Sequence, residues 1–172
     1  NPNSGKREDQ TDYPIMAVRE ALLNTLVHRD YSIHTEGDYI MAKTMGAQTV
    51  ETISGRHVVL SAGVGKTNVD ELKWLTDTVL SSASAWKSTG WAYIADCSKM
   101  DPVTPAEGRE LVEMTKMFVE AGCKAFAFAE GNSIMLKVQA QKNTERSQTG
   151  VIEGHFATVE EVLSWLQKDI HI

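Results

Sequence analysis

The hydrophobic pattern changes its period twice between residues 91 and 128. Residues 91–96 form a short, almost continuously apolar run, which is typical of a buried strand. Asp101 and Pro102 interrupt this run, and mostly apolar residues then recur at helical spacing. They are Leu111, Met114, Thr115 and Phe118. Residues 125–128 form a second buried run, so the pattern predicts a βαβ unit, which needs a parallel sheet beside it.

The sequence also predicts where the helix of this unit begins and ends. Thr104 suits the N-cap, Pro105 the first helical position, and Glu107 the third position of a capping box. These residues satisfy or avoid the backbone N–H groups that a helix start leaves unpaired. Gly122 suits the left-handed conformation that often follows a helix. We therefore expect the Thr104 side chain to bond the N–H of Glu107.

Further elements are predicted on both sides of the unit. Residues 49–53 and 57–60 are β-prone runs that predict a hairpin entering the same sheet. Helices are predicted at 68–86, at 134–146 and from 158 onward, each after a residue that can cap it. The capping residues are Asn68, Asn132 or Ser133, and Thr158. The order strand, strand, helix, strand, helix, strand, helix, helix predicts an α/β fold with helices packed on a sheet.

The first 40 residues are predicted to be a separate N-terminal arm, with residues 41–172 forming the second domain. Residues 13–30 follow a polar start and have the pattern of an amphipathic helix. Its apolar stripe consists of Ile15, Val18, Leu22, Leu23, Leu26 and Val27. Because soluble monomers rarely expose such a stripe, we expect it to be buried, and we favour a homodimer formed through residues 13–30 over burial on the chain's own domain.

Composition narrows the classes of partner. The net charge of −6 and the lack of a basic run argue against nucleic acid and against an acidic membrane surface. No apolar stretch approaches the length of a membrane span or a signal peptide, so a cytoplasmic protein is expected. Cys97 and Cys123 are the only cysteines, and each borders an apolar run, which favours reduced core thiols.

Several residues could carry chemistry. Asp96 ends a buried strand and could accept a phosphoryl group, although a solvated or cap-bonding aspartate is the simpler interpretation. Ser98 and Thr104 follow in the same loop and are candidates for phosphorylation, so the three residues form a candidate regulatory loop. The histidines show no ligand spacing, and no metal is predicted. They are His28, His34, His57, His155 and His171.

The segment 63–67, Gly-Val-Gly-Lys-Thr, invites comparison with a phosphate-binding loop between a strand and a helix. That motif requires a first glycine at position 60, where this chain has Leu60. A plain strand-to-helix turn is therefore the preferred interpretation, and no cofactor is predicted.

Residues 48–172 resemble the anti-anti-sigma-factor family (SpoIIAA-like, STAS). The resemblance is carried by WAYIADCS at 91–98, by the helix that Thr104 starts, and by FATVEEVLSWL at 156–166. It implies a STAS-like mixed sheet with helices packed on it and a small regulatory domain that binds partner proteins. Some members of the family are switched by phosphorylation of a serine where the helix after the central strand begins. Here residues 101–105 read Asp-Pro-Val-Thr-Pro and lack the family's Asp-Ser-Ser-Gly run.

Residues 13–32, YPIMAVREALLNTLVHRDYS, resemble the first helix of the ATPase-like domain in RecG-helicase-related regulators. The resemblance implies that Glu20 would act as a base and that Asn24 would hold magnesium. The glycine-rich motifs of that domain do not follow, so residues 1–40 are interpreted as a fragment of it.

Three function classes follow from these observations. The leading hypothesis is a non-enzymatic regulatory or protein-interaction domain of STAS-like type, whose protein partner the sequence does not identify. The first alternative is a module that binds an apolar or acyl small molecule between the sheet and its helices. The second alternative is a nucleotide-binding, ATPase-like protein that uses Glu20 and Asn24.

Overall fold

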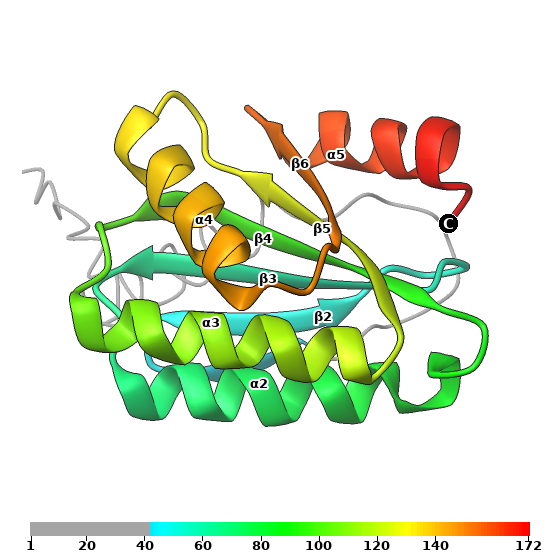
Figure 1. Cartoon of the computed structure of the whole chain (residues 1–172), viewed down its shortest axis with the longest axis horizontal. Coiled ribbons are helices and arrows are strands. Elements are labelled where there is room, and N and C mark those ends of the chain that lie inside the picture. Colours follow the sequence, from blue (N-terminus) through cyan, green and yellow to red (C-terminus); the bar gives the residue numbers. More distant parts are fainter. Residues whose placement is uncertain (1–41) are drawn as a thin grey trace, which may run out of the picture. The chain divides into compact units, whose positions relative to one another are not determined.

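The computed structural model describes residues 42–172, which form a six-stranded mixed sheet with helices packed on it (Figure 1). The strands are β1 (Lys43–Met45), β2 (Gln48–Thr52), β3 (Val58–Gly65), β4 (Trp91–Met100), β5 (Cys123–Ala129) and β6 (Ile152–Phe156). They lie side by side in sequence order. β1, β2 and β3 pair antiparallel, whereas β3, β4, β5 and β6 pair parallel. The expected α/β fold class is therefore confirmed, including the hairpin and the βαβ unit.

The helices begin where the capping residues predict. They are α2 (Val69–Ala83), α3 (Pro105–Glu120), α4 (Ile134–Ser147) and α5 (Val159–Trp165), with a 3₁₀ turn at Ser84–Trp86 and a π-helical turn at Leu166–Ile170. The N-cap side chains of Asn68, Thr104, Ser133 and Thr158 each accept a bond from the N–H three residues later. No helix within residues 42–172 is long and apolar enough to cross a membrane.

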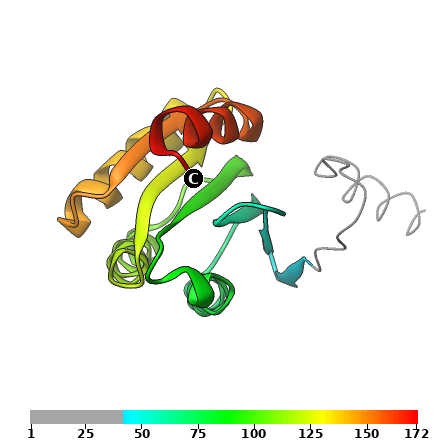
Figure 2. The same cartoon turned by 90° about the vertical axis from the view of Figure 1, so that its right-hand side faces the viewer.

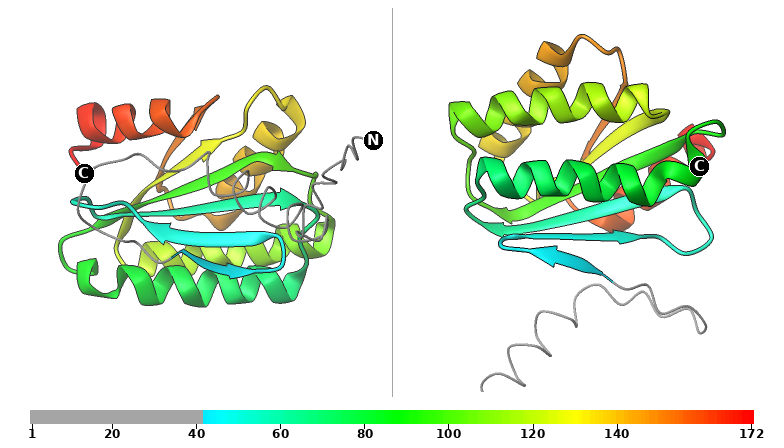
Figure 3. Two further views of the ribbon diagram at one scale, coloured as in Figure 1. Left: turned by 180° about the vertical axis from the view of Figure 1, so that it is seen from behind. Right: turned by 90° about the horizontal axis from the view of Figure 1, so that it is seen from below.

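The sheet has a hydrophobic core on each face. Trp91 and Tyr93 of β4 pack in the core under α2 and α3, whereas Ala92 and Ile94 pack in the core under α5. Figure 2 shows the sheet edge-on between these helices, and Figure 3 shows α2 and α3 side by side across one face. Burial on both faces explains why the central strands are continuously apolar rather than alternating.

The predicted stop after α3 is also confirmed. Gly122 has φ +91°, a conformation that glycine adopts without the steric cost of a side chain. A Cβ at this position would lie 2.3 Å from the carbonyl oxygen of Lys87. Two independent constraints, the backbone conformation and the close approach of another segment, therefore favour glycine here.

Two strands were not predicted, and β3 and β4 extend beyond their predicted ends, from residue 60 to Gly65 and from residue 96 to Met100. β1 is short and exposed, and β6 has the sequence IEGHF, so neither has a run of apolar residues. Both lie at an edge of the sheet, where only one neighbouring strand contributes hydrogen bonds. β4 continues beyond Asp96 to Met100 because its last residues still pair with β3, although β5 has already ended.

Candidate ligand-binding pocket

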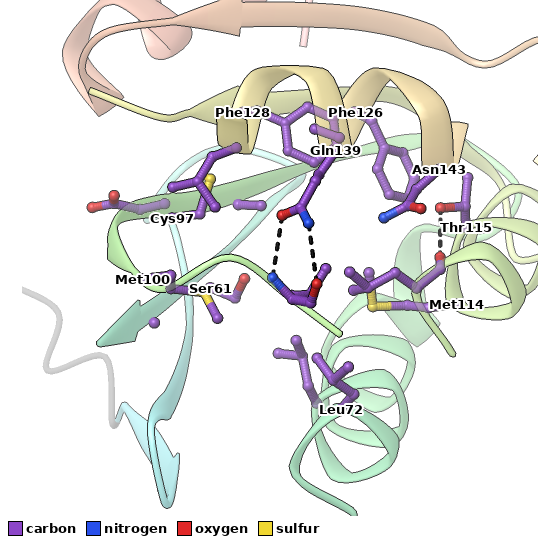
Figure 4. A pocket seen from close by; sticks show the side chains of 18 of the residues that line it. Ser61, Leu72, Cys97, Met100, Met114, Thr115, Phe126, Phe128, Gln139 and Asn143 are labelled. Atoms are coloured by element: carbon purple, nitrogen blue, oxygen red, sulfur yellow. Dashed lines mark hydrogen bonds between the residues drawn. The ribbon is translucent and has the colours of Figure 1, made fainter. Parts of the chain in front are cut away.

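A cavity of about 90 Å³ lies between the sheet and the helices α2, α3 and α4 (Figure 4). It is near the carboxyl ends of β3, β4 and β5, the position where open α/β sheets commonly bind ligands. Its volume is several times what one ordered water needs. Large apolar side chains form most of the wall, namely Leu72, Leu75, Leu111, Met114, Phe126 and Phe128.

Small residues explain why a space remains among these large side chains. Gly63, Ala95 and Ala140 line the cavity from β3, β4 and α4. Protein interiors are otherwise close-packed, so short side chains that face one another leave a hollow. The side chain of Met100 occupies the place of a side chain at Gly63, because a Cβ there would lie 2.3 Å from the Met100 sulfur.

Two polar side chains of the wall bond each other. The Ser61 hydroxyl lies 2.5 Å from the Tyr93 hydroxyl, and both residues are buried. Burial raises the pKa of Tyr93 well above its ordinary value, and the Ser61 hydrogen bond lowers it in part. The tyrosine is therefore neutral at physiological pH.

Gln139 connects α4 to the loop before α3. Its carboxamide nitrogen donates to the Val103 carbonyl at 3.0 Å, and its oxygen accepts from the Val103 N–H at 3.2 Å. Both bonds are visible in Figure 4. Val103 lies in a loop, where no helix or strand pairs its backbone N–H and carbonyl, so Gln139 provides their partners. The two bonds also hold this loop in place as one wall of the pocket.

The candidate regulatory loop divides into two separate hydrogen-bonded groups. Asp96 is only 6% exposed and lines the pocket, so of the two predicted alternatives, a solvated or a cap-bonding aspartate, it is not the solvated one. Its Oδ1 accepts from the Ser98 N–H at 3.0 Å and from the Ser98 hydroxyl at 2.7 Å. Thr104 instead caps α3, accepting from the Glu107 N–H at 3.5 Å while Glu107 accepts from the Thr104 N–H at 2.7 Å. The predicted capping box is confirmed.

Both cysteines are free, as predicted. Cys97 lines the pocket and donates to the Ala129 carbonyl at 3.6 Å. Burial raises the pKa of its thiol to about 12, and the negative charges of Glu130 and Asp96 contribute to the shift. A thiol with this pKa is protonated at neutral pH and is a poor nucleophile.

A second cluster lies at the β6 edge and was missed in the sequence. His155 Nδ1 lies 2.5 Å from Glu130 Oε1, and His155 Nε2 bonds Glu153 Oε1. The His155 ring stacks on Phe128, one of the pocket walls, with 5.3 Å between ring centroids. Glu153 and His155 lie two residues apart and so share one face of a strand, a signal that becomes readable only once β6 is recognised. Within residues 42–172, no group of three or more histidine, cysteine, aspartate or glutamate side chains is placed so that it could hold a metal ion.

The segment 63–67 forms a strand end and a turn, as preferred. Gly63 and Gly65 belong to β3, and Thr67 donates its hydroxyl hydrogen to Glu71 Oε2 at 3.1 Å. The predicted helix over residues 13–30 lies outside the described residues, as do Glu20, Asn24 and the boundary near residue 41. These predictions therefore remain predictions.

No protein-family model matches this chain, and no curated protein matches it. Among solved structures, the chain is similar to the NMR structure of the protein TM1081, with 15% sequence identity and a TM-score of 0.48. The alignment covers 81% of this chain and 98% of that chain. At that identity and score, the likeness supports no conclusion about function.

Proposed function

We propose that this chain is a non-catalytic regulatory domain of STAS-like type whose pocket binds a small apolar molecule. The observation that carries the proposal is the apolar cavity under α2, α3 and α4. A concave, largely apolar site with a few polar groups is the usual form of a small-molecule site. The resemblance of residues 91–98 and 156–166 to the anti-anti-sigma-factor family supports the regulatory part of the proposal.

The state of the pocket's reactive groups favours binding over catalysis. Cys97 and Tyr93 are two side chains of the wall that could act as a nucleophile or a proton donor. Burial raises the pKa of both, so each stays protonated at neutral pH. Each is also engaged, Cys97 with the Ala129 carbonyl and Tyr93 with Ser61. These groups shape the wall and are not poised to react.

A saturable rise in thermal stability with added apolar ligand tests the binding role. 1-Octanol should raise the unfolding temperature with a saturable dose dependence, because a ligand that binds only the folded state stabilises it. Ala140→Leu should abolish the effect by filling the cavity from α4. Ala106→Leu makes the same change at an exposed position of α3 and should leave the effect intact. If 1-octanol raises the unfolding temperature equally in wild type and Ala140→Leu, the ligand does not bind in this pocket and the proposal is contradicted.

A protein partner is the second candidate function, and the exposed side of α4 supports it. Ile134 is 80% exposed and Met135 60%, and Val138 also faces solvent. The opposite side of α4 lines the pocket through Leu136, Gln139 and Asn143. One helix thus contacts both the pocket and the apolar surface, which would let ligand binding change a partner's affinity.

Substitution on α4 separates this partner surface from the pocket. Met135→Lys should weaken partner binding and leave the 1-octanol response unchanged. Lys142→Glu, an exposed charge change later on α4, is the control for charge effects. Loss of the 1-octanol response in Met135→Lys would show that the exposed side of α4 is not separable from the pocket.

A further inference from the structure

The charge of the pocket wall restricts the ligand that can enter. Asp96 and Asp101 are the charged residues of the wall, and both are acidic. No lysine, arginine or histidine lines the cavity. A carboxylate or phosphate drawn into this space would lose its hydration without gaining a cation, and it would meet two like charges. The wall therefore disfavours the ionised head group of a fatty acid.

Two buried carboxamides face the same cavity with little or no hydrogen bonding. Asn143 of α4 is 9% exposed, and its side chain makes no hydrogen bond to another residue within 42–172. Every fully buried side-chain nitrogen and oxygen of these residues has a partner, so the polar atoms of Asn143 are open to the pocket. Gln48 of β2 is 2% exposed, and its amide nitrogen reaches only the Met100 sulfur, at 4.0 Å. A thioether sulfur is a weak acceptor. By contrast, the carboxamide of Gln139 makes two good hydrogen bonds to Val103.

A largely buried carboxamide whose polar atoms open into a pocket can be paired there by water or by a ligand. Each carboxamide offers two donor hydrogens and a carbonyl oxygen without carrying charge. Figure 4 shows the Asn143 side chain directed from α4 toward Thr115 and Met114 of α3, on the helix side of the pocket. A neutral group with both a donor and an acceptor would complement Asn143 in a pocket that no lysine, arginine or histidine lines.

We propose that the pocket takes an uncharged amphiphile, whose amide, ester or hydroxyl group bonds Asn143 while its apolar part fills the space between Leu72, Met114 and Phe126. Asn143 is the residue that recognises the polar group. This inference rests on the proposed function, because it names the chemical class of the ligand for the same pocket.

A matched series of eight-carbon probes tests the charge requirement in the full-length wild-type chain. The probes are octanamide, 1-octanol, octanoate and octylammonium, titrated calorimetrically at neutral pH. Octanamide and 1-octanol should bind at least about tenfold more tightly than octanoate, a difference worth about 1.4 kcal/mol. Octanoate or octylammonium binding as tightly as octanamide would overturn the inference and leave the binding function standing. Failure of all four probes to bind would overturn both.

Asn143→Leu tests the recognition residue. Octanamide affinity should fall about tenfold. The unfolding temperature of the ligand-free protein should be unchanged or higher, because the change removes no hydrogen bond between described residues. Gln141→Leu makes the same change on the exposed side of α4 and should affect neither quantity. Unchanged octanamide affinity in Asn143→Leu, or a clear drop in its unfolding temperature, would show that Asn143 has a structural role instead.

Discussion

The imidazole of His155 lies 2.5 Å from the carboxylate of Glu130, which is only 3% exposed. Its other nitrogen bonds Glu153. The imidazole thus links a carboxylate that follows β5 to a carboxylate of β6. Because Phe128 lines the pocket and stacks on His155, this cluster lies next to the ligand site.

The first prediction concerns the pH dependence of stability. Burial raises the pKa of Glu130 above its ordinary value of 4.5, and the hydrogen bond and charge of His155 lower it in part. The folded state thus holds this proton more tightly than the unfolded chain does. The tighter proton binding of Glu130 therefore stabilises the folded state. This stabilisation is complete below the ordinary pKa and is lost as the pH rises through the folded-state pKa.

Urea unfolding of wild type and Glu130→Gln across a pH series measures this contribution. The stability of wild type relative to Glu130→Gln should fall as the pH is raised from about 4 to about 8, because the amide does not titrate. Glu145→Gln changes an exposed glutamate of α4 and is the matched control. If the difference in the free energy of unfolding between wild type and Glu130→Gln does not change with pH, the pKa of Glu130 is not raised in the folded state.

The second prediction concerns the cap of α3. Thr104→Ala should lower the free energy of unfolding by about 1 kcal/mol, because the Glu107 N–H loses its acceptor. Thr104→Ser keeps the hydroxyl and should cost much less. If Thr104→Ala leaves stability unchanged while a phosphorylated form disappears, Thr104 is a modification site and its capping role is minor.

The third prediction concerns the aromatic core. The Phe118 ring lies 5.5 Å from Trp91, 5.0 Å from Tyr93 and 5.8 Å from Phe126 between ring centroids. Phe118→Ala should therefore lower the free energy of unfolding by about 3–5 kcal/mol. Met117→Ala, at the neighbouring exposed position, should cost less than about 1 kcal/mol. Similar losses in both variants, measured by denaturant unfolding, would show that α3 does not pack as described.

The fourth prediction concerns the contact between Gly63 and Met100. Gly63→Ala should displace the Met100 side chain, since the new Cβ would lie 2.3 Å from its sulfur. Methionine is flexible, so the loss of stability should stay below about 2 kcal/mol, while 1-octanol affinity changes with the shape of the wall. Met100→Ala in the same chain should restore the stability. A double variant no more stable than Gly63→Ala would show that other contacts limit this site.

The fifth prediction concerns residues 1–40. The chain without them should fold and sediment as a monomer, whereas the full chain should sediment as a dimer formed through the apolar stripe of residues 13–30. Sedimentation velocity of both proteins measures the difference, and circular dichroism shows whether the shortened chain is folded. Equal oligomeric states would rule out the dimer, and an unfolded shortened chain would show that the first residues belong to the fold.

The amino-acid sequence by itself determined the elements whose signals are local. A capping box needs only Thr104 and, three residues later, Glu107, and a strand buried on both faces is apolar throughout, as at residues 91–95. The helices, the hairpin and the βαβ unit could therefore be predicted. The end of β4 could not, because its last residues are strand only through pairing with β3.

The tertiary structure alone decided the edge strand β6 and the candidate site. His155 and Glu130 are far apart in the chain, and only the pairing of β5 with β6 brings them together. The pocket likewise depends on small residues from separate elements facing one another, which no local pattern records. The burial of Asn143 could not be predicted for the same reason. A polar residue on a helix is usually exposed, and only the packing of α4 against α3 buries this one.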